Sequence, residues 1–316
     1  MKIGFSTFKF SKKLYLNDEV HPEGKAVLIT GCDSGFGHLA AKRFDAEGFR
    51  IFACCLFPSG EGALELQKTC SKKLKVLELN VTSDDSVKKV LKSVEESLGN
   101  DVLWALVNNA GMTSGFTVEL SPMQAFQDCL EVNAIGPIRV TKAFLPLLRK
   151  SRGRVVNVTS LTGRQSFPFM SPYIISKHAS AAFNDCLRTE MDMWGIRVIS
   201  VEPDCFKTYL LSEERVDEEF ETLMATLDDN LKSEYGQVYL QKFKAIKRQT
   251  YAAASPKIDL VVDSIHSAVT DEFPEITYSP RGSRFLMVVH YVFQKLCYSL
   301  QDMIVRTLMY VLGLRK

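Results

Sequence analysis

The chain has 316 residues, of which 46% are hydrophobic and 24% are charged, values typical of a globular protein rather than a disordered or collagen-like chain. Its 39 Lys and Arg against 37 Asp and Glu give a formal net charge of +2, which excludes a general electrostatic footprint for nucleic acid. Eight cysteines without a Cys-x-x-Cys pair indicate neither a disulfide scaffold nor a zinc ribbon. Because no His, Cys and Asp cluster has ligand spacing, we expect no metal.

Residues 1–23 are expected to form a basic tail. This segment carries four lysines before Asp18 and no arginine. A solvated tail is favoured over a weak mitochondrial transit peptide, because such peptides prefer arginine.

Short apolar runs then alternate with segments of helical periodicity. Runs typical of buried strands cover 26–29, 50–55, 75–79, 103–107, 154–158 and 197–201. Segments that suit helices cover 38–47, 84–98, 122–133, 137–149 and 173–194. This alternation predicts right-handed βαβ units, and thus one α/β domain over residues 24–281 with a parallel sheet covered on both faces.

A glycine-rich turn follows the first predicted strand and precedes a helix. Glycines allow a tight turn and let backbone N–H groups approach a pyrophosphate at a helix N-terminus. In this context the turn predicts a dinucleotide site rather than an ordinary strand–helix connection. The residues assigned to it are Gly31, Asp33, Ser34, Gly35, Phe36 and Gly37.

The end of the second predicted strand bears on the choice of cofactor. It places Cys55 where an acidic residue would bind the ribose 2′-hydroxyl, and no Lys or Arg follows before Lys68 to bind a 2′-phosphate. Asp33 in the glycine turn would repel an added phosphate. We therefore expect NAD, with NADP the less favoured cofactor.

A candidate catalytic set lies further along the chain. Tyr173 and Lys177 are four residues apart, so on a helix they share one face, and a nearby ammonium lowers the pKa of a phenol. Such a tyrosine can exchange a proton with an alcohol or carbonyl. Ser160 follows a predicted strand, and Asn133 lies in a helical segment. Tyr-x-x-x-Lys alone is a common pattern whose simpler interpretation is a solvated helix pair.

Together with Asn108-Asn109-Ala110-Gly111, these motifs resemble the short-chain dehydrogenase/reductase family over residues 24–281. The resemblance implies a single Rossmann-type domain with a doubly wound parallel sheet of about seven strands. It also implies that Tyr173 is the acid/base and that Lys177 lowers its pKa and holds the nicotinamide ribose. Ser160 would orient the substrate oxygen, and Asn133 would support a proton-relay water. Hydride would pass between the substrate carbon and the nicotinamide.

The resemblance also extends the expected cofactor contacts. They become Asn80, Val81, Asn109, Ala110, Gly111, Tyr173, Lys177, Pro203 and Thr208. Two positions depart from the family pattern. Asn80 stands where an Asp often binds the adenine, and Asp204 stands where a Gly follows the proline.

Segments such as "SPYIISK" and "GIRVISVEP" resemble one branch of the family, which holds D-β-hydroxybutyrate dehydrogenase, retinol dehydrogenases and the type 2 17β- and 11β-hydroxysteroid dehydrogenases. The resemblance to the hydroxybutyrate enzyme is the closest overall. The implied substrate is a small alcohol or ketone, either 3-hydroxybutyrate-like or a hydrophobic retinoid or steroid alcohol.

The loop before Tyr173 is the expected substrate wall, with Arg164, Phe167 and Met170 as tentative contacts. Met170 replaces a basic residue of the hydroxybutyrate enzymes, which favours a hydrophobic alcohol because an apolar wall binds no carboxylate. A homo-oligomer is also expected. The alternative function is a non-catalytic nucleotide-binding scaffold of the same fold.

Residues 210–250 are expected to form a substrate lid that begins with an acidic run, interpreted as a solvated helix face. Tyr235 and Tyr239 within it could be lid core or substrate wall. Residues 282–316 form an expected amphipathic helical tail, in which basic residues outnumber the single acid Asp302. Through 285–316 we expect either peripheral membrane association or packing on the core or a second subunit. The expected location is intracellular and membrane-associated, with endoplasmic reticulum and mitochondrion left open.

Overall fold

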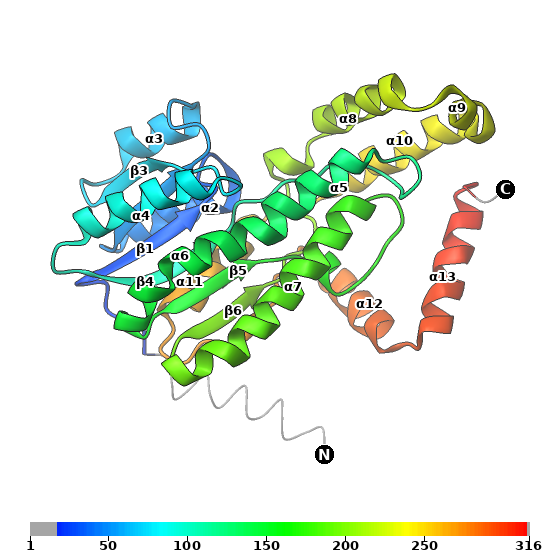
Figure 1. Cartoon of the computed structure of the whole chain (residues 1–316). Helices are drawn as coiled ribbons and strands as arrows, with labels where there is room; N and C mark the ends of the chain where they lie inside the picture. The colour runs from blue at the N-terminus through cyan, green and yellow to red at the C-terminus, as the bar shows by residue number, and fades with distance from the viewer. Residues whose placement is uncertain (1–17, 315–316) are drawn as a thin grey trace, which may run out of the picture.

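A single parallel sheet forms the centre of the protein, whose computed structural model describes residues 18–314 (Figure 1). Its seven strands follow the order β3-β2-β1-β4-β5-β6-β7, and all the neighbouring pairs are parallel. The strands are β1 (Lys25–Thr30), β2 (Arg50–Cys55), β3 (Leu74–Glu78), β4 (Val102–Asn108), β5 (Arg154–Val158), β6 (Arg197–Val201) and β7 (Thr277–Tyr278). This order confirms the doubly wound Rossmann-type sheet.

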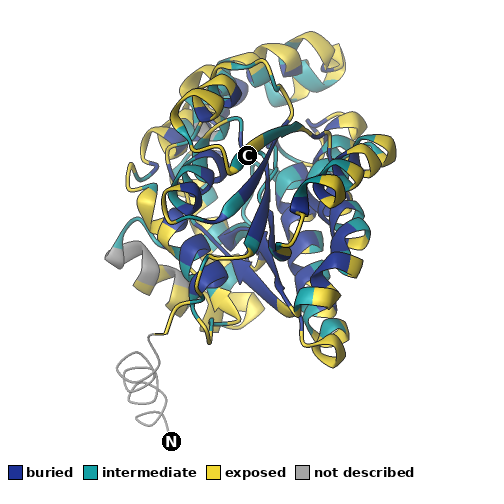
Figure 2. Cartoon of the chain, turned by 90° about the vertical axis from the view of Figure 1, so that its left-hand side faces the viewer, coloured by how far each residue is buried: buried dark blue, intermediate teal, exposed yellow. Residues whose placement is uncertain are grey.

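Helices cover both faces of the sheet, as the dark buried strands between two helical layers show (Figure 2). On one face Val27 and Ile29 of β1 pack with α2 (Gly35–Ala46), α3 (Glu61–Thr69) and α11 (Asp259–Thr270). On the other face Ala26 and Leu28 pack with α4 (Asp84–Leu98), α6 (Gly136–Ser151) and α7 (Ser171–Met191). Because successive strand residues point to opposite faces, two separate apolar layers require strands that are apolar throughout.

The lid is a helical subdomain with an apolar cluster of its own. It consists of the short turn η4 (Tyr209–Leu211), α8 (Glu213–Thr226), α9 (Asp229–Tyr235) and α10 (Gln237–Ala252). Phe220, Leu223 and Phe243 of the lid pack against Phe116 of the core. Tyr235 and Tyr239 also pack against this cluster, and their ring centroids are 5.1 Å apart. They therefore belong to the lid core.

The expected C-terminal helix is divided in two. Cys297 has extended backbone angles (φ −67°, ψ 156°) and separates α12 (Arg284–Lys295) from α13 (Tyr298–Val311). In the described part of the chain, no helix is both long and apolar enough to cross a membrane. Phe167 of the core stacks on Phe293 of α12, with ring centroids 6.3 Å apart. The tail is thus in contact with the loop that precedes α7.

The domain begins earlier than residue 24. Glu19 forms an antiparallel bridge with Asp271, and the Val20 N–H donates to the Thr270 carbonyl at 2.7 Å. Residues 18–23 therefore lie against the end of α11. The rest of the expected basic tail, residues 1–17, lies outside the described residues.

Candidate active site

A cleft of about 940 Å³ opens where the carboxyl ends of β1 and β4 meet. After β1 and after β4 the chain turns toward opposite faces of the sheet. Doubly wound sheets bind ligands at such a point. Most of the expected site residues line the cleft. They are Gly31, Asp33, Ser34, Gly35, Phe36, Asn109, Ala110, Gly111, Ser160, Tyr173, Lys177, Pro203 and Thr208.

The glycine turn has the backbone that a bound pyrophosphate needs. Gly31 and Gly35 have φ angles of 71° and 64°, which favour glycine. Ser34, the residue before α2, makes no side-chain cap hydrogen bond, so it leaves the first N–H groups of this helix to face the cleft. These features fit the diphosphate of a dinucleotide.

Gly37 does not line the cleft but holds the turn in place. A Cβ at this position would lie 2.4 Å from Nδ2 of Asn109 and 2.5 Å from the Gly31 carbonyl oxygen. Asn109 in turn donates from Nδ2 to the carbonyls of Thr30 at 2.9 Å and Gly31 at 3.0 Å. The asparagine that follows β4 therefore links the glycine turn to the next strand of the sheet.

The carboxylate of Asp33 occupies the end of β2. It accepts hydrogen bonds from the backbone N–H groups of Leu56 at 3.0 Å and Phe57 at 2.9 Å. Cys55 differs from the expectation, because its side chain is fully buried on the same face of the sheet as Ile51. Leu56 and Phe57 line the cleft in its place.

Two further expected contacts, Asn80 and Val81, follow β3 and lie outside the cleft lining. The side-chain oxygen of Asn80 accepts from the N–H and hydroxyl of Thr82 at 3.0 and 2.8 Å. Val81 is buried, and its side chain packs against Gly136 at the start of α6. Both side chains therefore shape the loop after β3.

Ser160, Tyr173 and Lys177 meet in the cleft. Ser160 and Tyr173 both line this cleft, and the Ser160 hydroxyl oxygen accepts from the Thr162 hydroxyl at 2.9 Å. The ammonium of Lys177 lies 5.7 Å from the Tyr173 ring centroid and donates to the Val158 carbonyl at 3.2 Å. A strand end and one face of α7 thus bring a hydroxyl, a phenol and an amine together.

Burial sets the ionisation of this pair. It raises the pKa of Tyr173 to about 12, although the Ser160 side chain acts to lower it, and it lowers the pKa of Lys177 to about 8. The direction for Tyr173 is opposite to the lowering that the resemblance implies, because desolvation of the phenolate outweighs its hydrogen bonds. At neutral pH the phenol is therefore protonated.

Asn133 lies behind the cleft in η1, a π-helical turn (Glu131–Ile135) between α5 (Met123–Leu130) and α6. Its Nδ2 donates to the Met112 carbonyl at 2.8 Å and to the Ser176 hydroxyl at 2.9 Å, and its Oδ1 accepts from the Met112 N–H at 2.8 Å. Single π turns inside helices are frequent at functional sites. In this geometry Asn133 positions Met112, a residue of the cleft wall.

The expected substrate contacts lie outside the cleft lining. Arg164 is engaged elsewhere, since it forms ion pairs with Asp185 at 2.7 Å and Glu202 at 3.0 Å. Phe167 packs against the tail, and Met170 precedes the first turn of α7. Between them Phe169 has a φ of 87°, rare for a bulky residue, and packs on the lid residue Phe243 with centroids 4.7 Å apart.

Asp204 keeps ordinary backbone angles, since only Arg152 and Phe169 among the described non-glycine residues have positive φ. Its carboxylate accepts from the Gly282 N–H at 3.1 Å, which joins the loop after β6 to the segment after β7. The family's glycine is therefore not required here for conformational reasons.

Other cleft residues were not anticipated from the sequence. They are His38, Leu39, Leu56, Phe57, Gly60, Glu61, Gly62, Ala63, Glu65, Met112, Thr113, Val158, Thr159, Asp204, Phe206, Lys207, Tyr209, Leu210, Arg215 and Ile258. Gly60 and Gly62 could have indicated this part of the cleft wall, since closely spaced glycines suggest a close approach of the backbone. A Cβ on Gly62 would lie 1.9 Å from the Asp33 carbonyl oxygen. Arg215 had no such signal, because it stands in the acidic part of the lid.

Comparison with known proteins identifies the family. The family model described as short chain dehydrogenase matches residues 25–219. Estradiol 17-beta-dehydrogenase 2 of Mus musculus is 39% identical over 266 residues, covering 84% of this chain and 70% of that protein. Mitochondrial D-beta-hydroxybutyrate dehydrogenase of Rattus norvegicus is 38% identical over 277 residues, covering 85% and 80%.

A solved short-chain dehydrogenase from Streptomyces avermitilis shares the fold. Its TM-score is 0.69 at 23% identity, with 92% of this chain and 99% of that chain covered. The position of the cleft, at the carboxyl ends of β1 and β4, is the one expected for a dinucleotide-binding fold and agrees with these similarities. The chain therefore belongs to the short-chain dehydrogenase family, in the branch of the hydroxybutyrate and type 2 hydroxysteroid dehydrogenases, and is an NAD(P)-dependent oxidoreductase that acts on a CH–OH group.

Proposed function

We propose that this protein interconverts a hydroxyl and a carbonyl with Tyr173 as the proton donor and acceptor. The observation that carries the proposal is that Ser160, Tyr173 and Lys177 line the cleft that also contains the glycine turn. When bound, the nicotinamide gives or takes the hydride. Ser160 orients the substrate oxygen, and Tyr173 exchanges the proton with that oxygen. Lys177 supplies positive charge on the same face of α7.

The test is NAD reduction with 3-hydroxybutyrate, retinol and hydroxysteroids, using the wild-type protein and Tyr173→Phe. General acid–base catalysis contributes about 10²–10⁴-fold, so we expect a loss of that order in kcat. Tyr298→Phe is the matched control, since Tyr298 is 89% exposed on α13. Unchanged turnover in Tyr173→Phe would contradict the proposal. Tight NAD binding without turnover of any alcohol would instead favour the non-catalytic scaffold.

We propose NAD as the preferred cofactor. The carboxylate of Asp33 lies at the end of β2, where its bonds to Leu56 and Phe57 hold it at the place that a 2′-phosphate would approach. We expect Asp33→Ser to raise the ratio of kcat/KM for NADP over NAD by about tenfold or more, because like-charge repulsion is removed. Asp101→Asn is the control, since this carboxylate is paired with Arg50 and lies outside the cleft lining. An unchanged ratio in Asp33→Ser would contradict the assignment.

We propose a hydrophobic alcohol, such as a retinoid or steroid, as the first substrate class, with a 3-hydroxybutyrate-like acid as the second. Support for the first class comes from the ion pairs with Asp185 and Glu202 that occupy Arg164, the base expected to bind a substrate carboxylate. Both classes are represented among the relatives named above. The panel of alcohols given for Tyr173→Phe distinguishes them.

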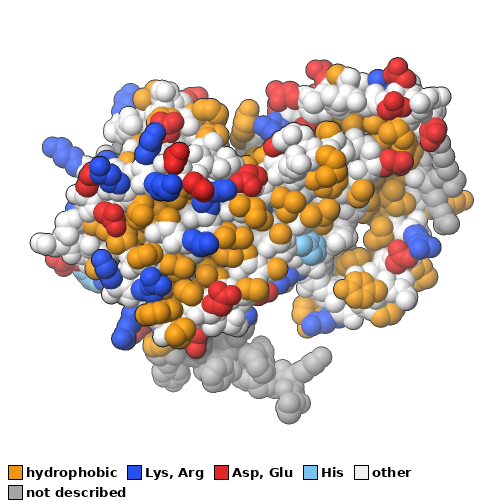
Figure 3. Space-filling model, in the orientation of Figure 1, with side chains coloured by type: hydrophobic (Ala, Val, Ile, Leu, Met, Phe, Trp, Pro, Cys, Tyr) orange, Lys and Arg blue, Asp and Glu red, His pale blue; other side chains and the backbone are white. Residues whose placement is uncertain are grey.

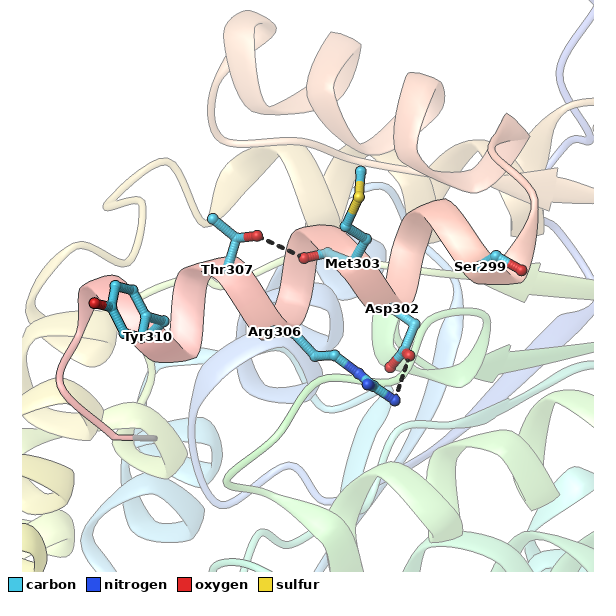
Figure 4. A pocket seen from close by; sticks show the side chains of 6 residues that line it. All are labelled: Ser299, Asp302, Met303, Arg306, Thr307 and Tyr310. Carbon is cyan, nitrogen blue, oxygen red and sulfur yellow. Dashed lines mark hydrogen bonds and ion pairs between the residues drawn. The ribbon is translucent and has the colours of Figure 1, made fainter. Parts of the chain in front are cut away.

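We propose that α12 and α13 bind a membrane surface peripherally. Apolar side chains are exposed along both helices: Val288, Val289, Tyr291, Val292, Leu300, Met303, Ile304, Leu308, Tyr310 and Val311. Hydrophobic side chains also appear over α12 in the space-filling view (Figure 3). A hollow of about 460 Å³ beside α13 is lined by described residues of this helix alone, including the ion pair of Asp302 and Arg306 at 2.8 Å (Figure 4). It therefore offers no converging groups for a small ligand.

Flotation with vesicles of phosphatidylcholine and phosphatidylserine tests the membrane proposal. We expect the full chain to float with the vesicles, and a variant without residues 285–316 to stay behind. The double variant Met303→Glu and Leu308→Glu keeps the tail but adds charge to its exposed apolar side chains, so we expect weaker binding. Equal flotation of all three proteins would remove the tail as the anchor.

A further inference from the structure

The lid carries a charge pattern that the acidic run conceals. Three acids of α8 pair with three bases of α10, while Glu214, Glu218 and Glu221 form an exposed acidic face as expected. The pairs are Glu213 with Arg248 at 2.8 Å, Asp217 with Lys244 at 2.8 Å, and Glu219 with Lys247. Their formal charges cancel. The interface between the two lid helices is therefore neutral.

Arg215 is the base of α8 that remains outside this pairing. Among the described residues it forms no ion pair within 4.0 Å, and its Nε is buried without a hydrogen-bond partner. The centroid of the Tyr209 ring lies 5.8 Å from its guanidinium carbon. A buried guanidinium N–H without a partner is unfavourable, and native proteins usually satisfy such a group with protein, water or ligand.

Arg215 also lines the same cleft as the glycine turn and Tyr173. Among the acids near it, Glu213, Asp217 and Glu219 have partners on α10. Glu214 and Glu218 are exposed, and neither forms an ion pair with Arg215 within 4.0 Å. Across the cleft Asp33 is bonded to two backbone N–H groups. The positive charge of Arg215 therefore faces the cleft without a protein carboxylate in contact, and the group that would complete it is an anionic oxygen from a ligand.

We propose that Arg215 is an anion-binding residue of the active-site cleft, presented by the lid. This inference rests on the proposed function and adds a specificity-determining residue to it. Two ligands of that function carry an anionic oxygen: the diphosphate of the dinucleotide and the carboxylate of a hydroxy acid. The start of the lid lies over the glycine turn, since Thr208 comes within 3.6 Å of a Cβ placed on Gly35. An anion held by Arg215 would thus bind the lid to the core.

The experiment compares Arg215→Gln with Arg248→Gln, a lid arginine whose partners Glu213 and Asp217 lie on the partly exposed side of α8. The first readout is the Kd of NAD in the absence of substrate, measured by titration calorimetry. The second is kcat/KM for 3-hydroxybutyrate relative to its methyl ester. Arg215→Lys keeps the charge without the Nε donor, and circular dichroism of each variant reports on folding.

We expect Arg215→Gln either to raise the Kd of NAD or to lower the acid-to-ester ratio of kcat/KM by about 10- to 100-fold, because a charge-assisted hydrogen bond is lost. A rise in the Kd of NAD assigns the diphosphate. A fall in the acid-to-ester ratio with an unchanged Kd assigns the carboxylate. In either case we expect Arg215→Lys to change the same readout less than Arg215→Gln does, because it keeps the positive charge. We expect Arg248→Gln to leave both readouts unchanged. If neither compound is turned over, the Kd alone decides.

The proposal is overturned if both readouts stay unchanged in Arg215→Gln, or if Arg248→Gln reproduces its effect, because the role would then be structural. If Arg215→Gln does not fold, Arg215→Lys decides, and it must then show the raised Kd of NAD or the lowered acid-to-ester ratio. Failure of the proposed function can be distinguished from failure of this inference. Tyr173→Phe tests turnover, whereas the Kd of NAD is measured without turnover.

Discussion

Lys247 offers the sharpest test of what holds the lid on the core. Its side chain is only 2% exposed, it pairs with Glu219 of α8, and it donates to the Gly115 carbonyl at 3.0 Å. The ammonium also lies 4.2 Å from the ring centroid of Phe116. One buried cation thus connects both lid helices to the loop after β4.

We expect Lys247→Met to cost about 3–5 kcal/mol, because breaking a buried ion pair leaves an uncompensated charge. The remaining carboxylate is that of Glu219, which is 12% exposed and has one oxygen already without a hydrogen bond. The double variant Lys247→Met with Glu219→Leu should recover much of the loss. Burial lowers the pKa of Lys247, so desolvation of the ammonium outweighs its attraction to Glu219.

Urea denaturation followed by circular dichroism measures these changes, and hydrogen exchange of α8 and α10 localises them. Lys244→Met is the matched control, because Lys244 is 22% exposed and its partner Asp217 is 36% exposed. We expect it to cost less than about 1 kcal/mol. A Lys247→Met variant as stable as this control, or a double variant no more stable than Lys247→Met, would refute the reasoning.

Two further outcomes follow from the site. Gly37→Ala should weaken NAD binding strongly, because the new Cβ would lie 2.4 Å from Nδ2 of Asn109. Gly60→Ala should weaken it less, because its Cβ meets the nearest atom at 3.1 Å. Equal Kd values of the two variants in calorimetry would contradict this. Because burial raises the pKa of Tyr173 to about 12, the phenol holds its proton at neutral pH. The rate of alcohol oxidation should therefore rise from pH 7 to pH 9 and carbonyl reduction should not, and oxidation fastest at pH 6 would be inconsistent.

Local sequence patterns were sufficient for six of the seven strands and for much of the cleft. Apolar runs predict buried parallel strands because both faces of such a sheet are covered. The glycine turn and the pair of Tyr173 and Lys177 are defined by backbone freedom and helical spacing over fewer than ten residues. These motifs carry the resemblance to the short-chain dehydrogenase family.

Tertiary packing decided which polar side chains reach the cleft. Arg164 is unavailable because Asp185 and Glu202 lie beside it in the fold, and Cys55 is buried because its strand position faces the helices rather than the cleft. Three acids of α8 find bases on α10 that are about thirty residues away, and Arg215 has no ion-pair partner among the described residues. Contacts between distant segments depend on how helices pack on each other, and a linear pattern of charges does not contain that geometry.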